Sequence, residues 1–246
     1  MSNNPDKYLQ MYKNVDNLIN GVYTSWYTNG NKSYESNYIN GKKNGLFVIW
    51  YNNGNKLSES NYVNDSLDGA FTSWYNNSNN NKLVECNYID GKKNGMYIKW
   101  DNVGRKILEC YYIDGKRNGL YVEWSNNGHK SIKCNYVDGK KHGLFIEWDY
   151  DEEKICEYNY VDGKMNGNCI KWFNNKQKSS ECNYIDNKKN GLCIKWYKNG
   201  DKYSECYYVD DKKNGLCVKW YNNGDKMSEC YYVNNNIIKT ISPINN

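Results

Sequence analysis

The sequence contains no run of about 20 apolar residues, the length that a membrane-spanning helix requires. Its first residues are polar and contain no apolar stretch typical of a secretory signal. We therefore expect a soluble intracellular protein in the reducing cytoplasm, with association at a membrane surface as a variant of this location. The formal net charge is only +5, because 33 basic residues are mixed with 28 acidic ones, and it does not indicate a nucleic-acid-binding protein.

Catalytic and metal-binding signals are also missing from the sequence. The only two histidines, His129 and His142, lie in polar turns beside lysines, where we expect them to be solvated. The sequence shows no nucleophile elbow, phosphate-binding loop or metal-ligand cluster, and its cysteines never occur with Cys-x-x-Cys spacing. These absences predict a protein that is not an enzyme and that needs no cofactor or metal.

Glycine occurs at only three positions of a repeating pattern that is marked by tryptophan. A Gly lies five residues before every Trp, and a Lys lies six residues after every Trp except Trp74, which Lys82 follows after eight; successive Trp residues are 24 residues apart except for this one gap of 26. A period of this size indicates a repeat protein, in which each small unit is stabilised by its neighbours. The tryptophans are Trp26, Trp50, Trp74, Trp100, Trp124, Trp148, Trp172, Trp196 and Trp220.

The repeat that ends at Trp100 shows the secondary-structure pattern. The segments Leu83–Ile89 and Met96–Trp100 alternate and are rich in β-forming residues, and the polar segment Asp90–Gly95 between them predicts a hairpin connection. Asn-Gly pairs such as Asn127-Gly128 then link several of the repeats to the next. We predict an all-β fold: an elongated solenoid of stacked antiparallel β-hairpins forming one continuous twisted sheet, with closure into a barrel as the alternative.

Three regions follow from this periodicity. Residues 1–20 form an N-terminal segment with a degenerate capping half-repeat, which keeps Val15 and Asp16 of the pattern. Residues 21–233 form an array of about nine hairpin repeats of 24 residues. Residues 234–246 form a C-terminal tail rich in isoleucine, which we expect to cover the last strand edge, because open sheet edges promote aggregation.

Charge suggests how the strands are paired. A glutamate lies fifteen residues before most tryptophans, and a lysine or glutamate lies immediately before Trp from the fourth repeat onward. If these positions are cross-strand neighbours, opposite charges alternate along the sheet, which is favourable. This register places Trp on one face with the residues two and four before it, Tyr112 and most cysteines. It also predicts that Lys133→Glu destabilises the array more than Lys154→Glu.

The ten cysteines fall mainly into two columns of the repeat. Residues of one column lie two strands apart, roughly 9 to 10 Å, which exceeds the limit of about 7 Å for a disulfide. We therefore expect free, buried thiols in a reducing compartment. The first column contains Cys86, Cys110, Cys134, Cys182, Cys206 and Cys230, and the second contains Cys169, Cys193 and Cys217.

The repeat resembles the MORN repeat family over about residues 12–233. Segments such as Gly45–Tyr62 and Gly191–Tyr208 combine a Tyr-x-Asn-Gly turn, an acidic residue before a Tyr and a closing aromatic residue. The pattern is most similar to the Trp-Tyr-x-Asn-Gly variant that also occurs in bacterial proteins labelled as antitoxins, and the composition is similar to MORN proteins of large DNA viruses. The resemblance implies a β-hairpin array that acts in protein assembly, with phospholipid association in some members.

We expect a scaffold for an unidentified protein partner, which would bind exposed aromatic residues along the sheet. Alternatively, these rings only cover a thin sheet. A second hypothesis is binding to anionic phospholipid through lysine-rich turns, although neighbouring aspartates weaken the field. A third is antitoxin-like neutralisation of a protein. The candidate partner-binding residues are Tyr51, Tyr75, Phe145, Tyr197 and Tyr221, and the candidate anion-binding residues are Lys92, Lys93, Lys116, Arg117, Lys140, Lys141, Lys188, Lys189, Lys212 and Lys213.

Overall fold

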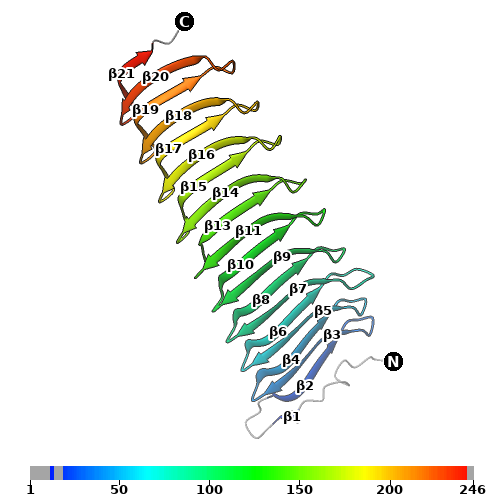
Figure 1. Cartoon of the computed structure of the whole chain (residues 1–246). Helices are drawn as coiled ribbons and strands as arrows, with labels where there is room; N and C mark the ends of the chain where they lie inside the picture. The colour runs from blue at the N-terminus through cyan, green and yellow to red at the C-terminus, as the bar shows by residue number, and fades with distance from the viewer. Residues whose placement is uncertain (1–11, 14–18, 243–246) are drawn as a thin grey trace. The chain divides into compact units, whose positions relative to one another are not determined.

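The computed structural model describes residues 12–13 and 19–242, and every regular element within them is a β-strand (Figure 1). The chain divides into two compact units, residues 1–119 and 120–246, with the boundary inside β10 (Lys116–Trp124). Val15 and Asp16, expected in the N-terminal cap, lie outside the described residues, as does the end of the C-terminal tail.

The first unit is an antiparallel sheet whose strands pair in chain order. Every pairing in its described part joins strands that follow one another, so the sheet stays open and the predicted stack of hairpins is confirmed. The strands are β1 (Tyr12–Lys13), β2 (Ile19–Trp26), β3 (Lys32–Ile39), β4 (Lys42–Trp50), β5 (Lys56–Val63), β6 (Ser66–Trp74), β7 (Lys82–Ile89), β8 (Lys92–Trp100) and β9 (Lys106–Ile113).

The second unit repeats this arrangement, and β11 pairs with both parts of a strand that is interrupted at His142. Part of the tail forms the last strand, β21, which pairs with β20. The strands are β11 (Lys130–Val137), β12 (Lys140–Lys141), β13 (Gly143–Trp148), β14 (Lys154–Val161), β15 (Lys164–Trp172), β16 (Lys178–Ile185), β17 (Lys188–Trp196), β18 (Lys202–Val209), β19 (Lys212–Trp220), β20 (Lys226–Val233) and β21 (Asn236–Ser242).

Two-residue turns close one end of the hairpins. Asp90 and Gly91 both have positive φ angles, 48° and 75°, as in a type I′ turn, whose twist matches that of the flanking strands. Ile89 pairs directly with Lys92 across this turn, so the predicted connection was too long. Asn and Asp tolerate positive φ, which explains why a repeat that lacks the turn glycine still forms the same turn.

The second glycine of the predicted connection lies inside a strand. Between Cys86 and Tyr88 of β7, the partner residue in β8 changes from Tyr97 to Lys93, so three residues of β8 lie opposite one residue of β7. Gly95 has a φ of 98° in this β-bulge, a conformation that side chains disfavour. The bulge therefore explains why a glycine lies five residues before every tryptophan.

The cross-strand register differs by one residue from the prediction. Glu85 pairs with Ile98, whereas Lys99 pairs with Val84. The predicted column of alternating charges on neighbouring strands is therefore wrong. The charge pattern has a local cause instead, because the glutamate binds the lysine three residues earlier in its own strand: Lys82 Nζ lies 2.6 Å from Glu85 Oε2.

This shift moves whole columns to the opposite face of the sheet. The residues two and four before each Trp share its face, as predicted, and we call this the tryptophan face. Tyr112 and the first cysteine column lie on the other face instead, where Cys110 pairs with Tyr97, the residue three before Trp100. We call this second face the cysteine face, and it includes both cysteine columns.

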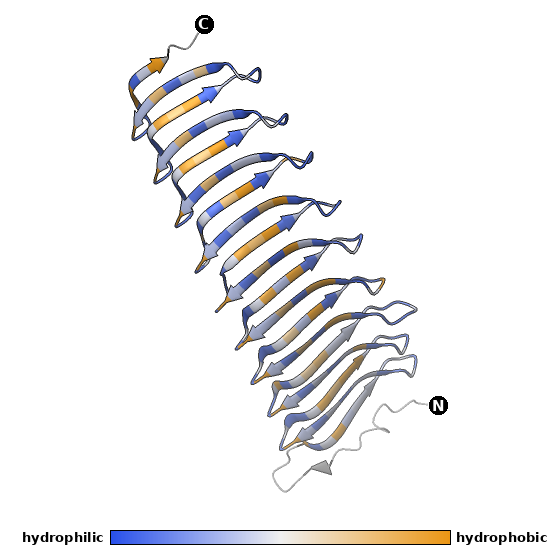
Figure 2. Cartoon of the chain, in the orientation of Figure 1, coloured by the Kyte–Doolittle hydropathy of each residue, from blue (hydrophilic) through white to orange (hydrophobic). Residues whose placement is uncertain are grey.

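The core of each unit lies on the cysteine face. All ten cysteines are at most 5% exposed, and Ser36 and Ser60, which occupy the first cysteine column in earlier repeats, are 1% and 3% exposed. The tryptophans are only half-buried, and Trp26 is 37% exposed. Apolar residues are interspersed along the strands, whereas most of the turns are hydrophilic (Figure 2). The residue that defines the period is therefore not the most buried one.

Candidate functional site

Aromatic rings and lysine side chains cover the cysteine face. Tyr97 and Tyr112 on neighbouring strands make an edge-to-face contact with centroids 5.8 Å apart. Lys93 Nζ lies 4.4 Å from the centroid of Tyr97 and 5.3 Å from that of Tyr112. Burial also raises the pKa of the Cys110 thiol, although its hydrogen bond to Tyr112 acts in the opposite direction. These contacts cover the cysteine face, on which residues 19–242 form no second layer.

The tryptophan face carries a repeated cluster of lysine, glutamate and tryptophan. Lys82 Nζ, which binds Glu85, also lies 5.7 Å from the ring centroid of Trp100. The same lysine therefore connects a carboxylate of its own strand to the indole of a neighbouring strand. This arrangement explains why the strand that follows each tryptophan begins with a lysine, and it gives these groups a structural role.

Exposed aliphatic side chains form a column on the tryptophan face of each unit. The residue eleven before each tryptophan from Trp50 onward, next to the two-residue turn, is Val or Ile, as is Val233 at the same position of β20, and the exposed fraction of these side chains is 42% to 52%. We call this column the aliphatic stripe. It consists of Ile39, Val63, Ile89 and Ile113 in the first unit, and of Val137, Val161, Ile185, Val209 and Val233 in the second.

Additional apolar residues extend the aliphatic stripe. Leu46 and Met96, four residues before their tryptophans, are 47% and 46% exposed, and Leu120 and Leu144 in the second unit are 45% and 40% exposed. Leu46 pairs with Asn61, and Val63 of the stripe lies two residues farther along the same face, within reach of a diagonal contact. This surface was not predicted from the sequence, although a β-branched residue before every turn was a visible signal.

The candidate aromatic residues have different environments. Phe145 is only 6% exposed, so the prediction that it is exposed was wrong: it packs on the cysteine face between Tyr158 and Tyr160. Tyr51, Tyr75 and Tyr197 are half-buried, and their hydroxyls donate to the backbone carbonyls of the next tryptophans, Trp74, Trp100 and Trp220 respectively, at 2.9 to 3.1 Å. Tyr221 is 38% exposed.

The candidate lysines do not form one row, because the two basic residues of each turn point to opposite faces. The second residue of each pair is half-buried, as Lys141 illustrates: its Nζ lies 4.2 Å from the centroid of Phe145. Lys93, Arg117, Lys189 and Lys213 occupy the same position. The first residue of each pair is exposed at the turn; these residues are Lys92, Lys116, Lys140, Lys188 and Lys212.

Aspartates of the following turns lie near these exposed lysines. Lys188 Nζ is 3.6 Å from Asp210 Oδ1, and Lys164 Nζ is 3.6 Å from Asp186 Oδ2. Exposed ion pairs of this kind contribute little to stability, but they reduce the positive potential of the turn edge. A different cluster forms on the cysteine face of the second unit, where burial, Lys219 and Lys195 together lower the pKa of Lys213.

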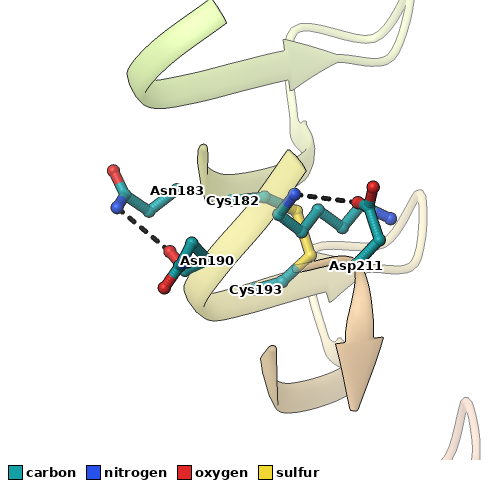
Figure 3. Close-up of a disulfide and its surroundings, with 6 residues drawn as sticks. Cys182, Asn183, Asn190, Cys193 and Asp211 are labelled. Carbon is teal, nitrogen blue, oxygen red and sulfur yellow. Dashed lines mark hydrogen bonds between the residues drawn. A yellow bond between two sulfur atoms is a disulfide. The ribbon is translucent and has the colours of Figure 1, made fainter. Parts of the chain in front are cut away.

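Cysteines of the two columns lie directly opposite one another, and two such pairs are disulfides. Cys182 is bonded to Cys193 (Figure 3) and Cys206 is bonded to Cys217, each with a Cα–Cα distance of 4.0 Å. The prediction of ten free thiols was therefore wrong. Residues of one column are indeed two strands apart, but the corrected register places the other column on the intervening strand and on the same face.

Asparagine side chains also have a structural role that was not predicted from the sequence. Beside the first disulfide, Asn183 Nδ2 donates to the carbonyl of Asn190 at 3.0 Å, opposite a β-bulge. At the Asn-Gly turns, asparagines donate to the next repeat, as Asn29 Nδ2 does to the carbonyl of Asn52 at 2.6 Å. Much of the asparagine content therefore satisfies backbone groups at turns and bulges.

No cluster of three or more potential metal ligands is present among residues 12–13 and 19–242. His129 and His142 are exposed, and each Nδ1 lies 3.9 Å from a carboxylate oxygen, of Glu152 and Asp162 respectively. A hollow of about 190 Å³ is lined by Gln177, Lys178, Trp196 and Gly200, a set without a nucleophile–base pair. The part of the chain that the structure describes also includes no helix with the length and apolarity to traverse a bilayer.

Comparison with known proteins identifies the repeat. Residues 19–40, 43–64, 189–210 and 213–234 match a family model described as MORN repeat variant. No curated protein matches the chain. Among solved structures, crystal structures of TcdB2-TccC3-Cdc42 and TcdB2-TccC3-TEV are similar over 88% and 89% of this chain, with 11% and 9% identity and TM-scores of 0.21 and 0.19. The matches span only 16% and 13% of those chains.

Proposed function

The chain is a MORN repeat protein of the variant type, and we propose that it is a non-enzymatic scaffold that binds a protein partner through its aliphatic stripe. The observation that supports this function is the uniform exposure of the stripe, where every Val or Ile is 42% to 52% exposed. Isolated exposed apolar residues are common on protein surfaces. A column that repeats in every hairpin is more typical of an interaction surface.

The chemistry of the surrounding residues fits a protein partner. Leu46 and Met96 add apolar area on one side of the stripe, and exposed lysines such as Lys92 lie at the turn on the other side. An apolar centre with a charged rim is the usual composition of a protein–protein interface. The five aromatic residues first considered fit less well, because Phe145 is buried and three of the tyrosines bind backbone carbonyls.

Polar substitutions in the stripe test this function. We expect Ile89→Asp combined with Ile113→Asp to reduce recovery of specific co-purifying proteins at least tenfold in quantitative mass spectrometry. The matched control carries Ser78→Asp and Asn79→Asp in an exposed turn of the same unit, which adds the same charge outside the stripe. Equal recovery with the two double variants, at equal unfolding midpoints, would show that the stripe does not bind the partner.

The second candidate function is binding to an anionic surface, and the lysine cluster of the second unit supports it more than the turn edge does. Lys219 and Lys195 lie close enough to Lys213 to lower the pKa of its ammonium group, in addition to the effect of burial. Flotation with phosphatidylserine vesicles at low and physiological salt tests this candidate. If the cluster binds anions, we expect the double variant Lys195→Glu/Lys219→Glu to lose vesicle binding. The double variant Lys188→Glu/Lys212→Glu, at the turn edge, should retain it. Antitoxin-like neutralisation is a special case of partner binding through the stripe.

A further inference from the structure

Six consecutive strands of the second unit each place one cysteine at the same level of the sheet. Cys169 pairs with Cys182, Cys182 with Cys193, Cys193 with Cys206, Cys206 with Cys217 and Cys217 with Cys230. We call this row the cysteine ladder. Each member is 2% to 4% exposed. The two disulfides occupy its second to fifth positions, and the end residues Cys169 and Cys230 have free thiols.

The spacing along the ladder permits a second set of disulfides. In an antiparallel sheet, each residue forms a narrow pair with one neighbour, at about 4.5 Å between Cα atoms, and a wide pair with the other, at about 5.5 Å. The bonded pair Cys182–Cys193 has a Cα–Cα distance of 4.0 Å and is therefore a narrow pair. It follows that Cys193 and Cys206 form a wide pair. Disulfides are most common at Cα separations of about 5.5 to 6 Å, so the wide pairs also have a suitable spacing.

We propose that the cysteine ladder is a thiol–disulfide exchange site, in which the two disulfides move by one strand between the narrow and the wide pairs. The end thiols are the nucleophiles, because each of them lies next to a disulfide sulfur. The cysteines follow one another across the strands, so the attacking sulfur, the attacked sulfur and the leaving sulfur are successive members of one row. Displacement at a disulfide needs this order of the three sulfurs.

The exchange is balanced without an external oxidant. The Cys230 thiolate attacks Sγ of Cys217, the new Cys217–Cys230 bond forms, and the Cys206–Cys217 bond breaks with its electron pair on Cys206. Cys206 then attacks Sγ of Cys193, forms the Cys193–Cys206 bond and releases the Cys182 thiolate, which takes up the proton that Cys230 lost. Two disulfides are present before and after, and the free thiols are now Cys169 and Cys182.

The opposite direction starts from the other end of the ladder. Cys169 attacks Cys182, and the released Cys193 attacks Cys206, so that Cys217 becomes a free thiol. Both directions create the Cys193–Cys206 bond, but only this one creates Cys169–Cys182. If a small disulfide such as oxidised glutathione then accepts the electrons of the two remaining thiols, all six cysteines are bonded in wide pairs. Narrow pairing leaves the two end thiols without a partner inside the ladder.

Burial affects the speed of this exchange. Desolvation raises the pKa of the Cys169 thiol, while Lys171 and Lys189 act in the opposite direction. A small thiolate fraction makes the attack slow, within the minutes-to-hours range of uncatalysed disulfide rearrangement. Burial also slows reaction with thiols and disulfides in solution, so exchange within the row precedes oxidation by glutathione.

Peptide mapping of the full-length chain distinguishes all the pairings. At least one lysine separates successive ladder cysteines in the sequence, so trypsin places each in its own peptide. The chain is alkylated in acid, digested without reduction and analysed by mass spectrometry. In the wild type we expect Cys182–Cys193 and Cys206–Cys217 together with a Cys193–Cys206 fraction that increases over hours. Oxidised glutathione should convert this mixture to the three wide pairs. Narrow pairs only, or no disulfides, would overturn the proposal.

Serine variants provide the decisive comparison, and Ser36 and Ser60 show that the fold accepts serine in the first cysteine column. We expect Cys230→Ser to retain the Cys169–Cys182 product and to lack Cys217–Cys230, and Cys169→Ser to give the reverse. The double variant Cys169→Ser/Cys230→Ser has no attacking thiol and should contain only the narrow pairs. A Cys193–Cys206 bond in this double variant at the wild-type level would overturn the relay, because no end thiol could have produced it.

Discussion

The hydroxyl of Tyr27 donates a hydrogen bond of 2.7 Å to the backbone carbonyl of Trp50 in the next repeat. Tyr51 makes the same bond to Trp74. A tyrosine that follows one tryptophan therefore binds the backbone of the next tryptophan. This bond adds a side-chain link to the strand pairing, and it explains why Trp-Tyr is common in the repeat.

Removal of one such hydroxyl should destabilise the first unit. We expect Tyr51→Phe to lower the free energy of unfolding by about 1 kcal/mol, because the half-buried carbonyl of Trp74 loses its donor. Urea unfolding followed by tryptophan fluorescence measures the change. Tyr221→Phe is the matched control, since no tryptophan follows Trp220 in the sequence. An equal loss in both variants would contradict a role for the hydrogen bond.

The fold could be predicted because its signals are local. Alternating strands, turn residues and the period of Trp specify hairpins without knowledge of long-range contacts. The register could not be obtained in this way, because the opposite charges of Glu85 and Lys99 do not show that the two residues are cross-strand neighbours. The ion pair of Glu85 with Lys82 gives the same charge pattern in the sequence as a cross-strand column does. A shift of one residue then placed the first cysteine column on the wrong face.

The corrected register reverses the expected effect of Lys133→Glu. Lys133 pairs with Ile146 and occupies the glutamate position of the repeat, three residues after Lys130. A glutamate there can bind Lys130, as Glu157 binds Lys154 at 2.8 Å. We expect Lys133→Glu to stabilise the second unit by about 0.2 to 1 kcal/mol at low salt, the usual range for exposed ion pairs. Thermal unfolding at two salt concentrations measures this effect.

Lys154→Glu is the comparison for this variant. It removes the ion pair with Glu157 and the contact of Lys154 with Trp172, whose ring centroid is 5.7 Å from Nζ. We therefore expect it to destabilise the protein, so the order of the two variants is the opposite of the order that the charge column predicted. A larger loss from Lys133→Glu than from Lys154→Glu would restore the original register.

The candidate site was less predictable than the fold, for a physical reason. Tyr51 and Phe145 are both aromatic residues of the repeat, and the sequence does not distinguish their environments. It does not show that the Tyr51 hydroxyl binds a backbone carbonyl, or that the Phe145 ring is buried. Exposure in a one-layer sheet depends on which face each column occupies, and the face depends on register. The exposed position of Ile89 follows from the corrected register and the short turn, neither of which was available from the pattern.

Glu181 should show a pH response that depends on two donors. Lys178 and then Asn168, whose Nδ2 is 3.0 Å from Oε1, lower the pKa of this carboxyl below its ordinary value. A lowered pKa in the folded state contributes stability above the unfolded value of about 4.3, and this contribution is lost as the pH falls through the folded value. We expect Asn168→Ala to raise the pKa of Glu181 in a carboxyl NMR titration. Asn159→Ala, on the neighbouring strand β14, should leave it unchanged.

Glycine variants separate backbone strain from crowding at the bulge. Gly191 and Gly215 have φ angles of 96° and 115°, so alanine at either position should cost about 1 to 2 kcal/mol from the left-handed backbone alone. A Cβ on Gly215 would lie 3.2 Å from Cβ of Tyr207, whereas one on Gly191 would lie 3.8 Å from Cβ of Asn183. The first contact is with a side-chain root that cannot rotate away, and the second is ordinary van der Waals contact.

We therefore expect Gly215→Ala to lower the midpoint of urea unfolding more than Gly191→Ala does. Gly224→Ala provides the reference for strain without crowding, because its φ is 87° and no atom lies within 4 Å of the added Cβ. If crowding decides the difference, Gly191→Ala and Gly224→Ala have similar midpoints and Gly215→Ala has a lower one. Three equal losses would instead attribute the whole cost to the backbone conformation. The tyrosine beside the bulge at Gly215 would then be accommodated without strain, and the glycine column would reflect φ alone.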